Sequence, residues 1–345
     1  MSEQPSLLTP ILLTRSAALI VDYCVGVQAG DRCLVISDKN RWSEAEAVAG
    51  IILARGATPL LMDVSSEIAR YYANHQRPEP PDHMAATFAA SNFVFAVTDV
   101  EYCHMLGHTE KNQAAMESGG MQYVLVEEDM SSWTTTTEEI DVFVERTFKV
   151  TELLSKGKSV HVTTQKGTDA RFQLKPGRKV WSFAARTSER REAPIVPNYA
   201  ESACVPWEGT MEGRAIIDGY IISVGADHRD DPVEFIIKKG RAVEVNGGPA
   251  AARLRAIMDA ADENANNMAE CGICTSHREK RSYEYEYGVP GHFSYGAWGT
   301  THFAVGHSHT IGGDIHSKIH LDCQMYDTTV YVDDACVMEN GVYKI

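Results

Sequence analysis

Short runs of apolar residues alternate with amphipathic segments along the first part of the chain. The apolar runs have the length and the near-continuous hydrophobicity of parallel β-strands that are buried on both faces. The segments between them carry apolar residues at three- and four-residue spacing, and glycines stand where several of them stop, as is typical of helices. We predict strands at residues 34–37, 59–64, 93–97 and 123–126, and helices at residues 7–27, 42–55, 66–75, 83–90 and 109–118.

From about residue 159 the pattern changes to short strands separated by turns, with one alanine-rich helical segment. We predict a helix at residues 249–270 and strands at residues 160–164, 170–174, 214–218, 220–225, 233–237, 242–245, 301–305, 319–322 and 329–332. The polar segment 152–158 is predicted to be a hinge between the two patterns. The predicted fold class is therefore α/β, with a doubly wound (Rossmann-like) α/β domain over residues 1–155 and a β-rich α+β domain over residues 156–345.

Composition and charge narrow the function. The chain has 345 residues, of which 44% are hydrophobic and 23% charged, with a formal net charge of −15. Such an acidic chain lacks the clustered basic residues that nucleic-acid binding needs. The apolar stretch at residues 7–27 contains Arg15 and Asp22, which argues against a signal peptide or a membrane span. Eight cysteines are too few for a disulfide scaffold. We expect a cytoplasmic protein without nucleic-acid or membrane partners.

Histidines are concentrated near the C-terminus. Six of the thirteen are His292, His302, His307, His309, His316 and His320. His320 opens a His-Leu-Asp triplet that ends at Asp322, and residues two apart in a strand project from the same face. Imidazole and carboxylate are the usual ligands of Zn²⁺, Mn²⁺ and Fe²⁺, so His320 and Asp322 are candidate ligands of one ion. The alternative for each single histidine is an exposed or a hydrogen-bonded core residue.

Two glutamates outside the cluster are further candidates. Glu201 lies in a proline-rich segment, where it is either functional or an ordinary surface charge. Glu270 precedes the apolar Cys-Gly-Ile, where an unpaired carboxylate would be costly and a metal ion would relieve the cost. His302 lies in an otherwise apolar predicted strand.

Several short motifs, in this order and spacing, carry a family resemblance. They are Val-Gln-Ala-Gly-Asp-Arg-Cys-Leu-Val-Ile at residues 27–36, His108-Thr109, Gly-Thr-Asp at 167–169, Glu-Gly-Thr at 208–210, Glu-Cys-Gly-Ile at 270–273, Gly-Thr-Thr-His at 299–302 and Ile-His-Leu-Asp at 319–322. The chain resembles the aminopeptidase T family of metallo-aminopeptidases (thermophilic metalloprotease type), whose relatives include iron-dependent 2,5-dihydroxypyridine dioxygenases. The resemblance runs over nearly the whole length.

The resemblance implies a metal site that hydrolyses amide bonds. In the aminopeptidases two ions are bound by five side chains, and the matching positions are Glu201, Glu270, His302, His320 and Asp322. Glu270 matches the bridging carboxylate and general base, which would take the proton of a metal-bound water. His309 stands where the family has a catalytic tyrosine, so it would support the oxyanion or protonate the leaving group.

We therefore predict a metallohydrolase of the aminopeptidase or amidase type that cleaves a peptide-like C–N bond in a small substrate. Two divalent ions (Zn, Co or Mn) would bind per chain in the C-terminal catalytic domain. The resemblance also implies a homodimer or a larger homo-oligomer.

The first alternative is a mononuclear Fe(II) dioxygenase that cleaves the ring of a hydroxylated N-heterocycle such as a dihydroxypyridine. Its iron would be bound by His302 or His309 together with His320 and Asp322. His108 matches a histidine that serves as acid/base in these relatives, and the hydrolytic members tend to keep His-Thr there too. The resemblance therefore implies a catalytic role for His108 in either enzyme, and this residue would have to reach the site from the other domain.

Two features bear on this choice. The dioxygenase relatives have a histidine where this chain has Glu270 and lack a carboxylate matching Glu201, and both differences favour hydrolysis. Tyr283, Tyr285 and Tyr287 alternate along a predicted strand and form either an aromatic wall over a ring-shaped substrate or ordinary β packing. A second alternative is a metal- or ligand-binding protein without catalytic activity.

Overall fold

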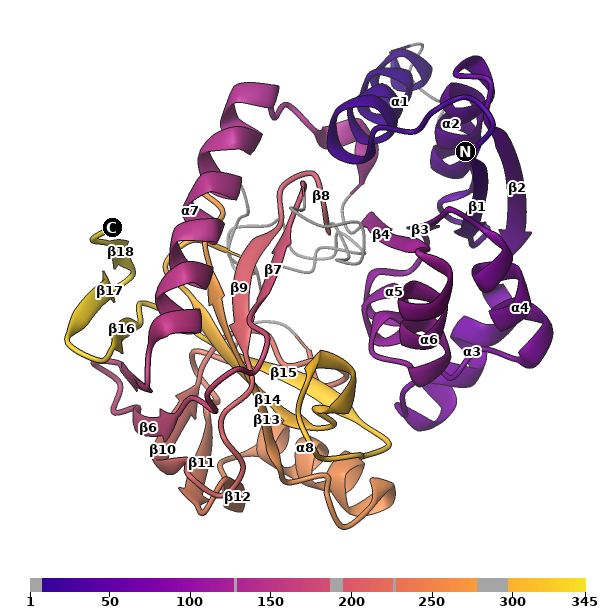
Figure 1. Cartoon of the computed structure of the whole chain (residues 1–345). Coiled ribbons are helices and arrows are strands. Elements are labelled where there is room, and N and C mark those ends of the chain that lie inside the picture. Colours follow the sequence, from indigo (N-terminus) through magenta and orange to yellow (C-terminus); the bar gives the residue numbers. More distant parts are fainter. Residues whose placement is uncertain (1–7, 127–128, 187–194, 226–227, 278–296) are drawn as a thin grey trace.

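The computed structural model describes residues 8–126, 129–186, 195–225, 228–277 and 297–345. It contains one parallel and two antiparallel sheets with helices packed around them, which confirms the predicted mixed α/β class (Figure 1). The helices are α1 (Thr9–Ala18), α2 (Trp42–Ala54), α3 (Ser65–Asn74), α4 (Asp82–Ala90), α5 (Val100–Gly107), α6 (Glu110–Gly119), α7 (Thr137–Lys156) and α8 (Pro249–Ala261). Shorter helical turns are the π-helix η1 (Leu19–Val25) and the 3₁₀ turns η2 (Met130–Ser132) and η4 (His309–Ile311).

The parallel sheet has the strand order β2-β1-β3-β4-β8. Its strands are β1 (Arg32–Ser37), β2 (Thr58–Asp63), β3 (Phe93–Val97), β4 (Gln122–Val126) and β8 (Ile195–Val196). β3 and β4 are buried along their whole length, and their alternate residues belong to two different hydrophobic clusters. A strand buried on both faces reads as a continuous apolar run, which is why β1, β3 and β4 could be predicted from the sequence. β2, at the edge of the sheet, is apolar in sequence but partly exposed.

An eight-stranded antiparallel sheet has the order β12-β11-β10-β6-β5-β16-β17-β18. Its strands are β5 (Ser159–Thr163), β6 (Asp169–Gln173), β10 (Glu212–Ile217), β11 (Val233–Lys238), β12 (Arg241–Asn246), β16 (Thr329–Val332), β17 (Ala335–Glu339) and β18 (Val342–Tyr343). Several of its strands are buried on alternate residues only, as β5 and β11 show. One face of this sheet packs on the core and the other is more open to solvent.

The second antiparallel sheet has the order β15-β14-β13-β9-β7. Its strands are β7 (Trp181–Ala184), β9 (Ala200–Cys204), β13 (Met268–Cys274), β14 (Thr301–Gly306) and β15 (His320–Met325). Every residue of β9, β13, β14 and β15 is buried. The long helix α7, whose N-terminus has a capping box, packs against β7 and β9. This buried sheet carries polar side chains that water cannot reach freely.

Three predictions of local structure are wrong. The helix predicted at residues 249–270 ends at Ala261, because Asp262 and the following asparagines form a turn and the chain then enters β13. Residues 220–225 form a turn rather than a strand, with Ser223 in a left-handed conformation at φ 65°. Residues 152–158 are not a hinge but mainly the end of α7.

The division into domains at residue 155 stays a prediction. The parallel sheet gains its fifth strand from β8, which lies beyond that boundary and pairs with β4. The two patterns of the sequence therefore do not map onto two separate sets of sheets.

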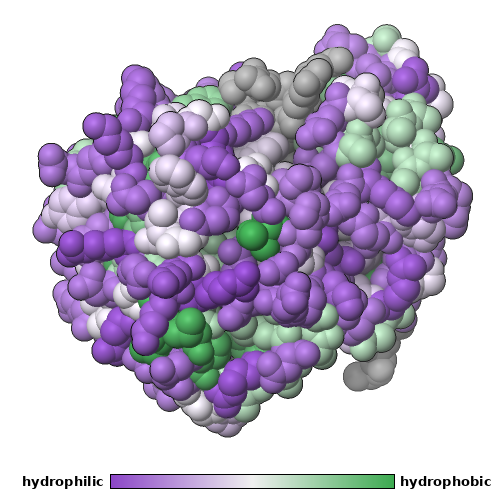
Figure 2. Space-filling view, turned by 60° about the horizontal axis from the view of Figure 1, so that its bottom comes forward, coloured by the Kyte–Doolittle hydropathy of each residue, from purple (hydrophilic) through white to green (hydrophobic). Residues whose placement is uncertain are grey.

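The face of the molecule in Figure 2 is mostly hydrophilic, with hydrophobic residues gathered in small, separate patches. No helix in the described ranges combines the length and the hydrophobicity needed to cross a membrane.

Candidate active site

The register of three neighbouring strands brings the candidate ligands to one face of the buried sheet. Glu270 on β13 and Asp322 on β15 are both paired with Ala304 on the central strand β14. Paired residues project from the same face of a sheet, and so do residues two apart on one strand. Glu270, Asp322 and His302 therefore share a face, and the residue of β14 between Glu270 and Asp322 is the small Ala304.

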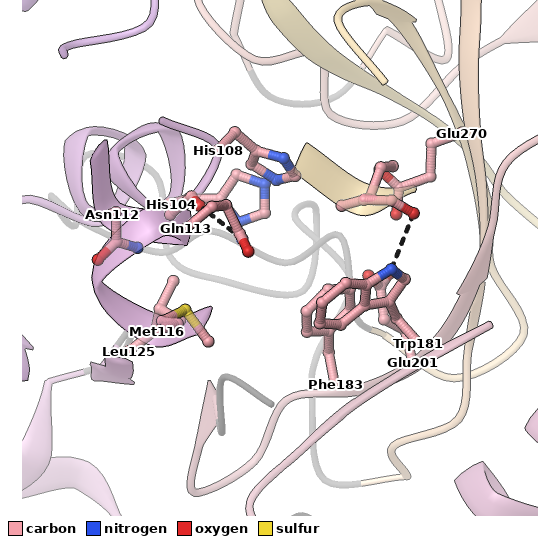
Figure 3. Close-up of a pocket in the computed structure, with 12 residues that line it drawn as sticks. His104, His108, Asn112, Gln113, Met116, Leu125, Trp181, Phe183, Glu201 and Glu270 are labelled. Atoms are coloured by element: carbon pink, nitrogen blue, oxygen red, sulfur yellow. Dashed lines mark hydrogen bonds between the residues drawn. The ribbon is translucent and has the colours of Figure 1, made fainter. Parts of the chain in front are cut away.

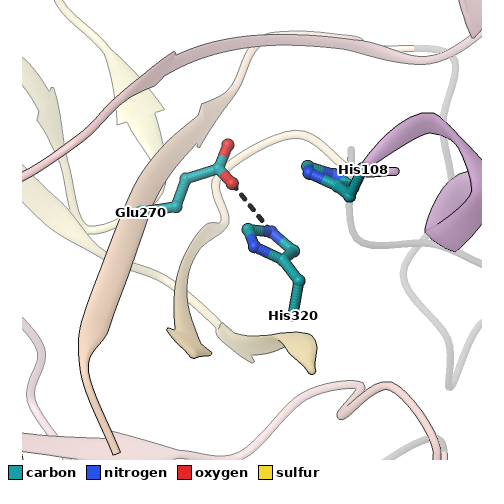
Figure 4. A group of neighbouring side chains, drawn as sticks. All are labelled: His108, Glu270 and His320. Carbon is teal, nitrogen blue, oxygen red and sulfur yellow. Dashed lines mark ion pairs between the residues drawn. The ribbon is translucent and has the colours of Figure 1, made fainter. Parts of the chain in front are cut away.

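His320 lies between the two carboxylates. Its Nε2 atom is 3.0 Å from Oε2 of Glu270 and 3.2 Å from Oδ1 of Asp322, and the contact with Glu270 is drawn in Figure 4. On the other side of the ring, Nδ1 is 2.6 Å from the carbonyl oxygen of His307 and donates to it. This bond occupies Nδ1, so Nε2, which faces the carboxylates, is the ring atom that would bind a metal.

The second part of the cluster is formed by His302. Its Nε2 atom lies 3.3 Å from Oε2 of Glu201 on β9, and its Nδ1 atom lies 3.9 Å from the sulfur of Cys274. Gly272 is paired with His302, and a Cβ atom at this glycine would collide with the His302 ring and with the Glu201 carboxylate. Glycine at position 272 thus makes room for this contact.

The N-terminal half contributes two histidines from α5 and its C-terminal cap. His104 Nε2 is 3.2 Å from Oδ2 of Asp322. The His108 ring stacks on His320, with 3.9 Å between the ring centroids and 15° between the planes. Arg77 donates from Nη1 to the carbonyl oxygen of His108 at 2.6 Å and from Nε to that of Ser317 at 2.9 Å. Through these two hydrogen bonds, Arg77 connects the end of α5 to the segment that precedes His320.

Charge in this cluster favours a cation. The carboxylates of Glu201, Glu270 and Asp322 are buried beside a small number of histidines. Burial of negative charge that no positive charge balances is costly. Burial lowers the pKa of His320, but Asp322 and Glu270 outweigh burial and raise it to about 10. Burial raises the pKa of Asp322, but His302, His104 and His320 together hold it well below its ordinary value. A divalent ion would supply the positive charge that these carboxylates attract.

Burial keeps two other histidines, His108 and His307, neutral. Burial, with His320 and His104 as neighbours, holds the pKa of His108 well below its ordinary value. Burial, with Arg77 and His320 nearby, lowers the pKa of His307 to about 2. His108 is thus uncharged, and burial makes it a weaker base than an exposed histidine. His307 orients His320 through its main-chain carbonyl.

Three sets of side chains have ligand atoms within 4.8 Å of one another. They are His108, Glu270 and His320; Glu270, His302 and Asp322; and Glu201, Cys274 and His302. The sets share members, so they form one continuous cluster. Histidine nitrogens and carboxylate oxygens are donors that suit a first-row transition metal.

The cluster opens onto a pocket between α5, α6 and the buried sheet, with about 500 Å³ of empty space when the solvent at its mouth is included (Figure 3). The pocket is lined by His104, Gly107, His108, Asn112, Gln113, Met116, Leu125, Trp181, Phe183, Glu201, Glu270 and Ile311. The Trp181 and Phe183 rings are stacked, with an interplanar angle of 4° and centroids 5.7 Å apart. Trp181 Nε1 donates to the carbonyl oxygen of Ile311 at 2.8 Å, which fixes the indole. The pocket combines a metal-type cluster with a stacked pair of aromatic rings.

The structure brings together all five residues that the sequence suggests as metal ligands, Glu201, Glu270, His302, His320 and Asp322. Their role as ligands stays a prediction. His108 reaches the cluster from the N-terminal half, as its predicted catalytic role requires.

His309 is not brought to this cluster. Its side chain is exposed on η4 and stacks on His316, with ring centroids 4.1 Å apart. His316 in turn pairs with Glu110 at 2.8 Å. The predicted wall of Tyr283, Tyr285 and Tyr287 lies outside the described residues, as does His292.

Several side chains of the site were not predicted from the sequence. His104, Asn112, Trp181 and Phe183 come from α5, α6 and β7. The four-residue spacing of His104 and His108 would have suggested a shared helix face, had α5 been recognised as a helix.

Comparisons with solved structures define the class of fold. The 2,5-dihydroxypyridine dioxygenase from Pseudomonas putida KT2440 superposes with a TM-score of 0.75 at 15% sequence identity, covering 97% of both chains. AmpT from Thermus thermophilus superposes with a TM-score of 0.64 at 16% identity, covering 97% of this chain and 99% of its own. At this identity the likeness shows the fold alone. No curated protein sequence matches the chain.

The sequence also matches a family directly. The sequence model of NicX, 2,5-dihydroxypyridine 5,6-dioxygenase, matches residues 21–344. The chain therefore belongs to the NicX family. This is the branch that the sequence analysis weighed as an alternative.

The family match corrects the predicted function. The prediction of a metallohydrolase, with aminopeptidase or metalloprotease activity, is wrong, because the family match indicates a dioxygenase. The error came from the weight given to Glu201 and Glu270. Metal binding itself is supported by the family and by the His/Glu/Asp cluster.

Proposed function

We propose that the protein is a mononuclear Fe(II) dioxygenase that cleaves the ring of a hydroxylated N-heterocycle such as 2,5-dihydroxypyridine. The observation that carries the proposal is the family match over residues 21–344. The pocket supports it, because a stacked pair of aromatic rings and a buried His/carboxylate cluster line the same space.

His320, Asp322 and Glu270 are the side chains proposed to hold the iron. Nε2 of His320 lies within 3.2 Å of an oxygen of each carboxylate. His302 lies beside Glu270 and Asp322. Glu270 would take the place of the second histidine that the resemblance assigns to the dioxygenase relatives. When bound, Fe(II) would supply the redox chemistry that allows O₂ to react with an organic ring.

The protein's own residues would bind the ring and move its proton. A dihydroxylated ring supplies the electrons for its own cleavage, so both oxygen atoms of O₂ enter the product and no external reductant is consumed. His108 is neutral and its Nδ1 atom is buried without a hydrogen-bond partner among the described residues. We assign it the role of accepting the proton of a ring hydroxyl. Trp181 and Phe183 would hold the ring plane and exclude water.

Oxygen consumption tests the proposal. Protein loaded with Fe(II) should consume O₂ in step with the loss of 2,5-dihydroxypyridine and should not hydrolyse dipeptides. Asp322→Asn should lose both iron and O₂ uptake, while the exposed Asp334→Asn should keep both. Metal-loaded protein that consumes no O₂ with any hydroxypyridine would refute the proposed function.

A further inference from the structure

A buried amide side chain of the pocket makes no hydrogen bond within the described part of the protein. Asn112 on α6 is fully buried and lines the pocket, yet neither its Oδ1 nor its Nδ2 atom has a hydrogen-bond partner among the described residues. The adjacent Gln113 differs, because its Nε2 atom donates to the carbonyl oxygen of Gly107 at 3.4 Å. Asn112 thus offers the pocket both a donor and an acceptor.

Such an arrangement is costly without a ligand. A buried amide without hydrogen bonds loses its contacts with water and gains nothing in exchange, so buried polar groups in folded proteins are nearly always bonded. A carboxamide presents its donor and its acceptor side by side in one plane. The group that satisfies both at once is another planar amide edge, with an N–H next to a C=O.

The other residues that line the pocket indicate which ligand shape it can bind. Trp181 and Phe183 form a stacked aromatic pair, and Met116 and Leu125 add apolar surface. In Figure 3, Asn112 and Met116 lie on the α6 side of the pocket, and Trp181, Phe183 and Glu270 lie across from them. A planar ring suits such an apolar, aromatic pocket, where one of its edges would face Asn112 and the other the His/carboxylate cluster.

We propose that Asn112 is the specificity-determining residue that recognises the lactam edge of a planar heterocycle. A 2-hydroxypyridine in its 2-pyridone form has an N–H beside a C=O. Asn112 Oδ1 would accept from the ring N–H, and Nδ2 would donate to the ring carbonyl oxygen. The ligand class is therefore 2-pyridones and similar cyclic amides, and ring diols without an N–H are excluded. This inference rests on the proposed function for the identity of the ring.

Equilibrium binding of matched rings tests the inference without turnover. Quenching of tryptophan fluorescence under anaerobic conditions reports the affinity of the full-length protein for 2,5-dihydroxypyridine and for hydroquinone, which has the same shape but no ring N–H. We expect wild type to prefer the pyridone by about tenfold or more, since unpaired buried polar groups would oppose hydroquinone.

Substitutions assign the preference to Asn112. Asn112→Leu should bind the two rings with equal affinity, because it loses the hydrogen bonds to the pyridone and no longer opposes hydroquinone. Asn112→Asp, which keeps the shape of the side chain but loses the donor, should also lower the affinity for the pyridone and covers the case in which the leucine variant does not fold. Glu117→Leu, on an exposed position of the same helix, should keep the wild-type preference.

The outcomes separate this inference from the proposed function. Equal affinity of wild type for both rings, or an unchanged preference in folded Asn112 variants, would overturn the role of Asn112 even if ring cleavage is observed. A preference that depends on Asn112, in a protein that consumes no O₂, would support the inference and overturn the proposed function.

Discussion

At the scale of single residues, Asp322 joins the two halves of the molecule. Its Oδ1 atom lies 3.2 Å from His320 on the same strand, and its Oδ2 atom lies 3.2 Å from His104 on α5. A carboxylate ligand held at its second oxygen keeps its orientation, and loss of such a supporting contact typically lowers metal affinity about 10- to 100-fold. His104 is therefore a positioning residue for the proposed metal site.

Substitution of His104 should weaken metal binding without unfolding the protein. We expect His104→Gln to lower the affinity for Fe(II) by about 10- to 100-fold, as is typical of residues that orient a ligand. Competitive titration with a chelator measures this affinity, and circular dichroism checks the fold. The exposed His316→Gln serves as the matched control. An unchanged affinity in His104→Gln would show that its contact with Asp322 does not matter.

At the scale of elements, strand register rather than the spacing of ligands along the chain builds the site. The His-Leu-Asp triplet could be recognised from the sequence, because two residues apart on a strand is a local relation. The pairing of Glu270 and Asp322 with Ala304 is a relation between strands, and it could not be predicted from one sequence. Glu270 was even predicted at the end of a helix, although β13 carries it.

Gly272 shows how closely the strands constrain the cluster. A side chain at this position would collide with His302 and Glu201. We expect Gly272→Ala to lower the free energy of unfolding by about 1–3 kcal/mol, as overpacking of a core does, and to reduce metal binding. Urea unfolding and metal titration measure the two effects.

Gly50→Ala is the control for this substitution. Gly50 lies on the exposed side of α2, where an added Cβ atom meets nothing within 4 Å. Alanine there should leave stability unchanged or raise it slightly, because alanine favours helix. A Gly272→Ala variant as stable as Gly50→Ala, with intact metal binding, would contradict the tight packing around His302.

At the scale of the whole molecule, a buried glutamate joins the two halves beside the site. Glu101 on α5 accepts hydrogen bonds from Tyr71 at 2.7 Å, Ser223 at 2.7 Å and Tyr220 at 2.9 Å. Tyr71 belongs to α3, whereas Tyr220 and Ser223 belong to the turn that was predicted as a strand. The α/β pattern of the first half could be read from the sequence, but this junction depends on contacts between distant segments.

From the hydrogen bonds of Glu101 with Tyr71, Tyr220 and Ser223, we predict a loss of stability at alkaline pH. Burial, reinforced by Glu101, holds the pKa of Tyr71 well above its ordinary value. The folded state therefore keeps the Tyr71 proton at a pH where the unfolded chain releases it, and the free energy of unfolding falls as pH rises above about 10. Urea unfolding between neutral and alkaline pH should show this fall. The slope should be smaller in Tyr71→Phe, and an identical slope would contradict the assignment.

The fate of O₂ tests the central claim, ring cleavage by a dioxygenase, most directly. Fe(II)-loaded protein is supplied with 2,5-dihydroxypyridine and isotopically labelled O₂, and the mass of the product is measured by mass spectrometry. We predict a ring-opened product that contains both labelled oxygen atoms, with one O₂ consumed per ring. A product without label, or cleavage of an amide bond without O₂ uptake, would contradict the account.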